Sequence, residues 1–157
     1  MIEQLTLWQK ELYKIAVDLE KRYRQKRWTI RSEFSLEKQI FVGFYIVRKI
    51  IESKKCNKAL NGMNYKIYTS PYLSKSGIMK NYNHPLNDYN LPNGKLEMIS
   101  IKELCNQFIH SYHFISAVPF GREMIGIYFV SDKVKVEKIY YIQLIKIVEI
   151  FVSFYKD

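Results

Sequence analysis

Apolar residues in the first third of the chain recur every three or four positions, the spacing of one face of an α-helix. From residue 2 to about residue 25, no Pro or Gly interrupts this spacing. A second stripe follows Ser35, a residue suited to a helix N-cap, and ends in the basic run at 48–55. The apolar run from Ile40 to Val47 also suits a buried strand, but the length of the segment and its basic end favour a helix. The pattern predicts two N-terminal helices joined by a short connection through Thr29–Phe34.

Residues 53–97 lack a regular period. They hold three of the four prolines and eight of the nine asparagines, which are typical of turns. Only Tyr65–Thr69 has the composition of a strand, while 83–85 and 91–94 are typical turn sequences. We expect a long irregular segment here, with at most one short strand.

The clearest helix signal covers Ser100–Tyr112. Ser100 and Glu103 have the spacing of a capping box, in which each side chain bonds the backbone N–H of the other residue. The apolar residues that follow form one continuous stripe, which predicts that Cys105 and Phe108 are buried. The stripe consists of Ile101, Leu104, Cys105, Phe108, Ile109 and Tyr112.

After this helix the apolar period changes to two, which indicates strands. Phe114–Val118, Met124–Ser131 and Val134–Tyr141 are separated by turn sequences, and a helix follows from about Ile142 to Tyr155. The chain therefore predicts an α+β fold in one domain spanning residues 1–157. Its elements are two N-terminal helices, an irregular middle, a capped central helix, a three-stranded antiparallel meander and a C-terminal helix. Lysines in the last strand, at 133, 135 and 138, suggest a sheet edge.

Composition narrows the class of protein. Hydrophobic residues make up 48% of the chain, enough for a packed core. The two cysteines, Cys56 and Cys105, form no C-x-x-C motif, so neither a disulfide framework nor a zinc knuckle is indicated. The longest apolar run is far too short for a membrane span, and the N-terminus does not resemble a signal peptide. We expect a cytoplasmic protein that needs no cofactor.

The formal net charge of +10 is concentrated in the first third of the chain. Residues 1–58 carry 14 basic and 7 acidic side chains, against 11 and 8 in residues 59–157. Cations near a helix C-terminus are favourable in themselves, but basic residues interleaved with aromatic ones also suit phosphate binding and base stacking. Compositional bias toward Lys is a further explanation of the surplus. The candidate nucleic-acid-binding residues are Lys21, Arg22, Arg24, Lys26, Arg27, Trp28 and Arg31.

The polar side of the 100–112 helix carries the candidate chemistry. The chain has no P-loop, no dinucleotide-binding glycine motif and no H-E-x-x-H zinc motif. Glu103, Asn106, His110 and His113 fall on one face of the expected helix. A solvated helix face explains them most simply. A metal would need a further ligand from elsewhere, so we expect no metal site.

The stretch from Leu104 to His110 resembles the motif helix of HEPN domains, small helical proteins of toxin–antitoxin and phage-defence systems. Some of these domains cleave RNA without a metal. The resemblance implies that Asn106 is the polar position of their motif and His110 its catalytic histidine. Cys105 stands where the family has an arginine, which favours a non-catalytic relative over an active nuclease. HEPN domains also lack strands of the kind predicted after residue 113.

Two classes of function remain from the sequence. The first is a non-enzymatic bacterial protein that binds a nucleic acid, RNA before DNA, or another protein. The last helix is apolar around most of its circumference, which predicts a homodimer or another protein partner at that helix. The alternative is a metal-independent ribonuclease that uses Asn106 and His110.

Overall fold

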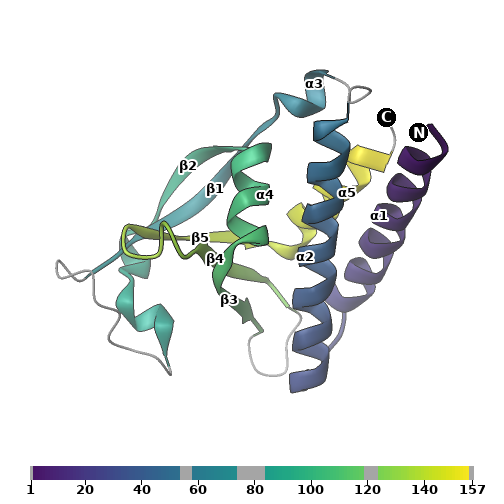
Figure 1. The fold of residues 1–157 in the computed structure, drawn as a ribbon. Helices are drawn as coiled ribbons and strands as arrows, with labels where there is room; N and C mark the ends of the chain where they lie inside the picture. The colour runs from purple at the N-terminus through teal and green to yellow at the C-terminus, as the bar shows by residue number, and fades with distance from the viewer. Residues whose placement is uncertain (1, 54–57, 74–83, 119–123, 156–157) are drawn as a thin grey trace.

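The computed structural model describes residues 2–53, 58–73, 84–118 and 124–155. It has an α+β fold in which helices cover one side of an antiparallel sheet (Figure 1). The helices are α1 (Ile2–Tyr23), α2 (Ile30–Glu52), α3 (Lys58–Asn61), α4 (Ile101–Ile109) and α5 (Leu144–Tyr155). The strands are β1 (Asn64–Pro71), β2 (Lys95–Ser100), β3 (Ser111–Ala117), β4 (Gly126–Ser131) and β5 (Lys138–Gln143).

The sheet has five strands in the order β2-β1-β5-β4-β3. The prediction of three strands is therefore wrong, because it did not include β1 and β2 in the sheet. The expected meander is present as β3, β4 and β5. It continues because β1 pairs antiparallel with β5 on one side and with β2 on the other. This pairing makes β5 a central strand.

The segment 53–97 is more regular than its composition suggested. It contains α3, all of β1, two short 3-10 turns at Pro85–Asp88 (η1) and Leu91–Asn93 (η2), and the start of β2. The expected strand at 65–69 is confirmed and is longer than predicted. Asn83, in the expected turn at 83–85, lies outside the described residues.

The second helix begins earlier than predicted. Its N-cap is Thr29, whose hydroxyl accepts from the Ser32 N–H while the Ser32 hydroxyl accepts from the Thr29 N–H. The sequence pattern did not predict the first turn of α2, because the apolar residues of that turn face solvent and do not extend the buried stripe. Ile30 and Phe34 are 88% and 66% exposed. The expected connection at 29–34 is therefore mostly helix, and Ser35 lies inside it.

The central helix begins where the sequence predicted, with the Ser100 hydroxyl accepting from the Glu103 N–H at 3.1 Å. It ends earlier, at Ile109, with His110 as its C-cap. Tyr112 and His113 lie instead on β3, because the chain pairs with β4 from Ser111 onward. The prediction that His113 shares a helix face with His110 is therefore wrong.

The lysines at 133, 135 and 138 do not mark a sheet edge. The chain turns at 132–137, and β5 begins only at Lys138. The Lys138 ammonium donates to the Glu97 carboxylate at 2.8 Å across the helix side of the sheet. Lys135 forms an ion pair with Asp132 and lies over the Tyr112 ring.

Aromatic rings join the layers of the core. Phe44 of α2 stacks on Phe108 of α4 at 4.3 Å between ring centroids, and Phe108 stacks on Phe129 of β4 at 3.9 Å. All three side chains are buried. Gly43 allows α5 to approach α2, because a Cβ at this position would overlap the ring of Phe151. Figure 1 shows α4 against the sheet, α2 beside it and α1 outermost.

The C-terminal helix finds its neighbours within one chain. α5 packs along α1, where the Tyr13 and Tyr155 rings stack at 4.4 Å and the Gln9 side chain donates to the Phe154 carbonyl at 3.2 Å. The dimer prediction depended on the nine apolar residues of the stretch from Ile142 to Phe154, and seven of these are buried, all except Ile145 and Val152. Oligomerisation stays a prediction without that support. No helix in the described ranges is long and apolar enough to span a membrane.

Candidate functional site

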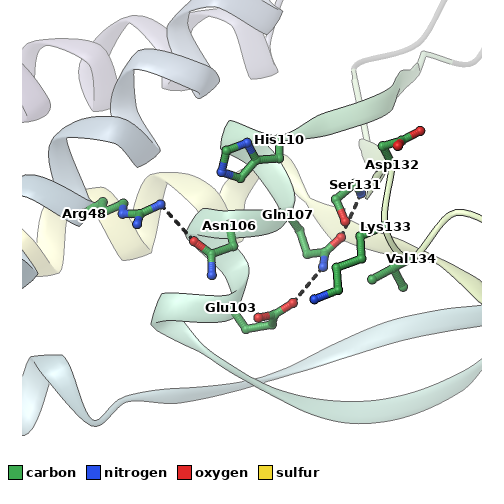
Figure 2. Close-up of a pocket in the computed structure, with 9 residues that line it drawn as sticks. All are labelled: Arg48, Glu103, Asn106, Gln107, His110, Ser131, Asp132, Lys133 and Val134. Carbon is green, nitrogen blue, oxygen red and sulfur yellow. Dashed lines mark hydrogen bonds between the residues drawn. The ribbon is translucent and has the colours of Figure 1, made fainter.

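A pocket of about 570 Å³ lies beside the polar side of α4 (Figure 2). It is bounded by α4, by the C-terminal part of α2 and by the turn after β4. The residues that line it are Arg48, Glu103, Asn106, Gln107, His110, Ser131, Asp132, Lys133 and Val134. Both candidate catalytic residues from the sequence, Asn106 and His110, are among them.

Arg48 of α2 enters this pocket and contacts Asn106. Its Nη1 donates to the Asn106 side-chain oxygen at 3.0 Å, and its Nε donates to the Glu52 carboxylate at 2.9 Å. The stripe of α2 fixes this direction, because Phe44, Val47 and Ile51 are buried and Arg48 falls at the border of the buried face. A guanidinium therefore lies beside Asn106 although position 105 holds a cysteine.

Gln107 builds the floor of the pocket and is buried. Its amide nitrogen donates to the Glu103 carboxylate at 2.7 Å, and its oxygen accepts from the Ser131 N–H at 2.8 Å. The bond to Ser131 ties α4 to β4. The bond to Glu103 lies within α4 and explains why the capping box is only half formed, since the Glu103 carboxylate bonds Gln107 in place of the Ser100 N–H. Sequence reasoning missed Gln107 because a single glutamine among apolar neighbours has no motif.

The two histidines of the motif region have different surroundings. His110 is exposed and lines the pocket. His113 is partly buried on β3, with its ring 6.4 Å from that of Tyr89. Burial lowers the pKa of His113 below its usual value, and the nearby Lys135 lowers it further. Among the described residues, no group of three or more His, Cys, Asp or Glu side chains lies close enough to hold a metal.

The charges around the pocket nearly cancel. Arg48 and Lys133 are matched by the carboxylates of Glu103 and Asp132. Figure 2 shows Lys133 extending toward Glu103, while Asp132 points away from the pocket toward solvent. The pocket therefore suits a small polar group more than a long polyanion.

Cys105 lies on the opposite side of α4 from the pocket and is buried. Burial raises the pKa of its thiol to about 12, against a smaller opposing effect of Arg48. Because the thiolate is the reactive form of cysteine, this side chain packs as a small apolar group and is no nucleophile.

The residues of the 21–31 patch divide into two groups. Arg22 bonds the Gln39 side chain and the Ser35 hydroxyl, both at 2.6 Å, and so holds α1 against α2. The Trp28 indole N–H donates to the Gln25 carbonyl at 2.9 Å and its ring packs on the core. These two side chains are structural. We call the other five, which are exposed, the basic turn: Lys21, Arg24, Lys26, Arg27 and Arg31.

No protein-family model, curated protein or solved structure matches this chain. The resemblance of α4 to HEPN domains therefore stays a prediction. The arguments for function have to come from the geometry of the molecule itself.

Proposed function

We propose that this protein binds RNA through the basic turn, as a non-enzymatic nucleic-acid-associated protein. The observation that carries the proposal is the display of five exposed cations on a turn that Arg22 and Trp28 hold in place. A fixed turn loses little conformational freedom when it meets phosphates. Residues 21–31 contain no Asp or Glu, and the neighbouring Glu20 is 3.9 Å from Arg24. The net charge of the basic turn and its immediate neighbours therefore remains positive.

RNA binding of this kind depends on salt, because each phosphate that a cation neutralises releases counterions. We expect the affinity for a labelled RNA to fall steeply between low and physiological salt. Replacing Arg24, Arg27 and Arg31 with Gln should reduce the slope of log Kd against log salt by about 2. Arg22 stays unchanged in this variant, because its bonds to Ser35 and Gln39 support the helix pair.

The matched control removes the same charge elsewhere. Lys10, Lys58 and Lys102 are exposed on α1, α3 and α4 outside the basic turn, and replacing all three with Gln changes the net charge equally. We expect a smaller loss of affinity in this control. An equal loss in both variants would reduce the interaction to general charge attraction and contradict a role for the basic turn.

A second candidate function is cleavage of RNA without a metal, favoured by the Arg48 guanidinium bonded to Asn106 beside His110. In such a reaction His110 would accept the proton of a ribose 2′-hydroxyl, and Arg48 would stabilise the negative charge that develops on the phosphate. Arg48 of α2 would thereby take the place of the motif arginine, which is absent because position 105 is a cysteine.

Incubation of the purified protein with total RNA, with and without a chelator, separates the two functions. Cleavage that resists the chelator and is lost in both His110→Ala and Arg48→Gln supports a ribonuclease. Retention of RNA without cleavage supports the binding function. Activity that survives in both variants would come from a contaminant and contradict the nuclease.

A further inference from the structure

One side of the sheet is left largely uncovered by the helices. Strand pairing aligns one row of outward side chains across all five strands on this side: Leu96, Tyr68, Tyr141, Tyr128 and Ile115. The next row contains Met98, Lys66, Gln143, Gly126 and Ala117. We call these two rows the open face.

Within the described parts of the chain, a cover exists at only one end of this side of the sheet. There Ile139 and Val130 are buried, and the segment containing η1 and η2 lies over them, with the Tyr89 hydroxyl donating to the Lys135 carbonyl. At the other end Tyr68, Leu96 and Met98 are 51%, 56% and 61% exposed. Large side chains so exposed in adjacent positions are unusual on a surface that binds nothing.

The tyrosines present their rings side by side. Tyr128 and Tyr141 lie 4.8 Å apart between ring centroids, and Tyr68 stands opposite Tyr141 on the neighbouring strand. Gly126 leaves room for this arrangement, because a Cβ there would meet the Tyr141 hydroxyl and the Ile142 carbonyl. Cross-strand pairing explains Tyr128 and Tyr141. It does not explain why Tyr68 projects beside the exposed side chains of Leu96 and Met98.

The charge on this surface has one sign. Lys66 belongs to the open face, and Lys146 of α5 lines the same hollow of about 240 Å³ together with Tyr68 and Tyr141. Among the described strand residues that point to this side, none is an Asp or a Glu. Lys146 also lies 3.3 Å from Glu149, at the border of the surface on α5.

We propose that the open face binds single-stranded RNA, with nucleobases stacked on the Tyr68, Tyr128 and Tyr141 rings and phosphates near Lys66 and Lys146. Aromatic rings interleaved with cations are the chemistry by which proteins hold unpaired bases and their backbone. A duplex hides its base faces and cannot use such a surface. A second copy of this chain fits less well, because a two-fold contact through this face would cover two copies of Lys66 while the described strand residues on this side offer no Asp or Glu to pair with them.

This inference rests on the proposed RNA binding and adds a second contact surface, beside the basic turn, and the strandedness of the ligand. The probes are a fluorescent ten-nucleotide oligouridylate and a strand of ten abasic residues with the same number of phosphates. We expect the wild type to bind the first strand at least about tenfold more tightly, since stacking requires bases.

Substitutions then locate the contact. Tyr68→Ala should weaken oligouridylate binding at least about fivefold, and Tyr68→Phe, which keeps the ring, should restore it. Tyr45→Ala is the matched control, because Tyr45 is similarly exposed but lies on α2. Lys66→Gln should flatten the salt dependence without reducing the preference for bases. Thermal melting by circular dichroism checks that each variant is folded.

The outcomes separate this inference from the proposed function. If the wild type binds RNA while Tyr68→Ala and Lys66→Gln bind equally well, the open face is not the site and the basic turn keeps its role. If the abasic strand binds as tightly as the oligouridylate, base stacking is refuted. If no RNA binds at low salt, both proposals fail. If light scattering shows a dimer that Leu96→Glu dissociates, the face joins two copies and this inference is overturned.

Discussion

The two sides of the sheet use aromatic residues for opposite purposes. On the helix side, Phe129 is buried under Phe108 and Phe44 in a continuous stack. On the other side, Tyr68 and Tyr128 belong to the same strands as buried residues but lie at the surface. Alternation along a strand allows both, because successive side chains point to opposite faces. The comparison teaches that ring content alone predicts neither stability nor binding, and that each ring must be assigned to a side.

The largest difference between the two sides should appear in Phe108→Ala. The ring stacks between Phe44 and Phe129, so its removal leaves a cavity between α4 and the sheet. We expect the free energy of unfolding to fall by about 3–5 kcal/mol. Urea denaturation followed by circular dichroism measures it. A loss below about 1 kcal/mol would mean that the stack is not the centre of the core.

Gly43→Ala tests how closely the helix side is packed. The new methyl group would overlap the ring of Phe151, so α2 and α5 would have to move apart. We expect a loss of about 1–3 kcal/mol in the free energy of unfolding. Gly62→Ala is the control, because a Cβ there makes only ordinary contacts with the carbonyls of Lys58 and Ala59. Equal losses at both positions would mean that the loss at Gly43 does not come from a clash with Phe151.

Ser100→Ala removes the cap that begins α4 where β2 ends. The Ser100 hydroxyl accepts from the Glu103 N–H, and without it that donor loses its partner. The expected cost is about 1 kcal/mol in chemical denaturation. Ser100→Asp keeps an acceptor at the cap and should restore most of the stability. Failure of Asp to do so would point to another role for the serine.

Acidification should lower the stability of the folded protein through His113, which lies at the end of the sheet that the segment containing η1 and η2 covers. Burial, aided by Lys135, lowers the pKa of this histidine in the folded protein below 6.5. The unfolded chain therefore binds more protons as the pH falls from about 6.5 toward the folded value, and stability decreases over that window. We expect this smaller effect in thermal melts between pH 7 and pH 5. It should be reduced in His113→Asn, and an unchanged pH dependence in that variant would assign the effect to other groups.

Tyr68→Ala should change stability least, even though the lost side chain is also a large aromatic one. About half of the Tyr68 surface is already exposed to solvent, so we expect a change within about 0.5 kcal/mol. The same urea titration used for Phe108→Ala measures it. A loss as large as that of Phe108→Ala would make Tyr68 a structural residue and remove the contrast between the two sides.

The sequence predicted the elements whose apolar period is buried and missed those whose apolar residues are exposed. α1, α4 and α5 follow clear stripes, and Ser100 was correctly identified as a cap. β2 was missed because its alternating apolar residues, Leu96 and Met98, point to solvent and produce no ordinary core pattern. The end of α4 was misplaced because pairing of β3 with β4 overrides a helical period that continues to Tyr112.

Only some of the residues that line the candidate pocket could be predicted from the sequence. Asn106 and His110 share the face predicted from local spacing and do line one pocket. Arg48 contacts Asn106 from 58 positions away in the chain, a contact that tertiary packing alone creates. Arg22 and Trp28 were grouped with the nucleic-acid-binding residues because charge and ring content are visible in a sequence, whereas their hydrogen bonds to Ser35 and Gln25 are not.

The contact between α1 and α5 has a consequence for the chain during its synthesis. α1 buries its apolar stripe against α5, a helix that begins at Leu144. Likewise, β1 can pair with β5 only after the chain has been made to residue 143. At roughly 5–20 residues per second, a ribosome needs on the order of ten seconds to make the intervening chain. Throughout that interval Leu12 and Ile15, both buried in the finished protein, have no α5 to cover them. The nascent chain therefore presents an amphipathic helix without its C-terminal partner until translation reaches the final strand and helix.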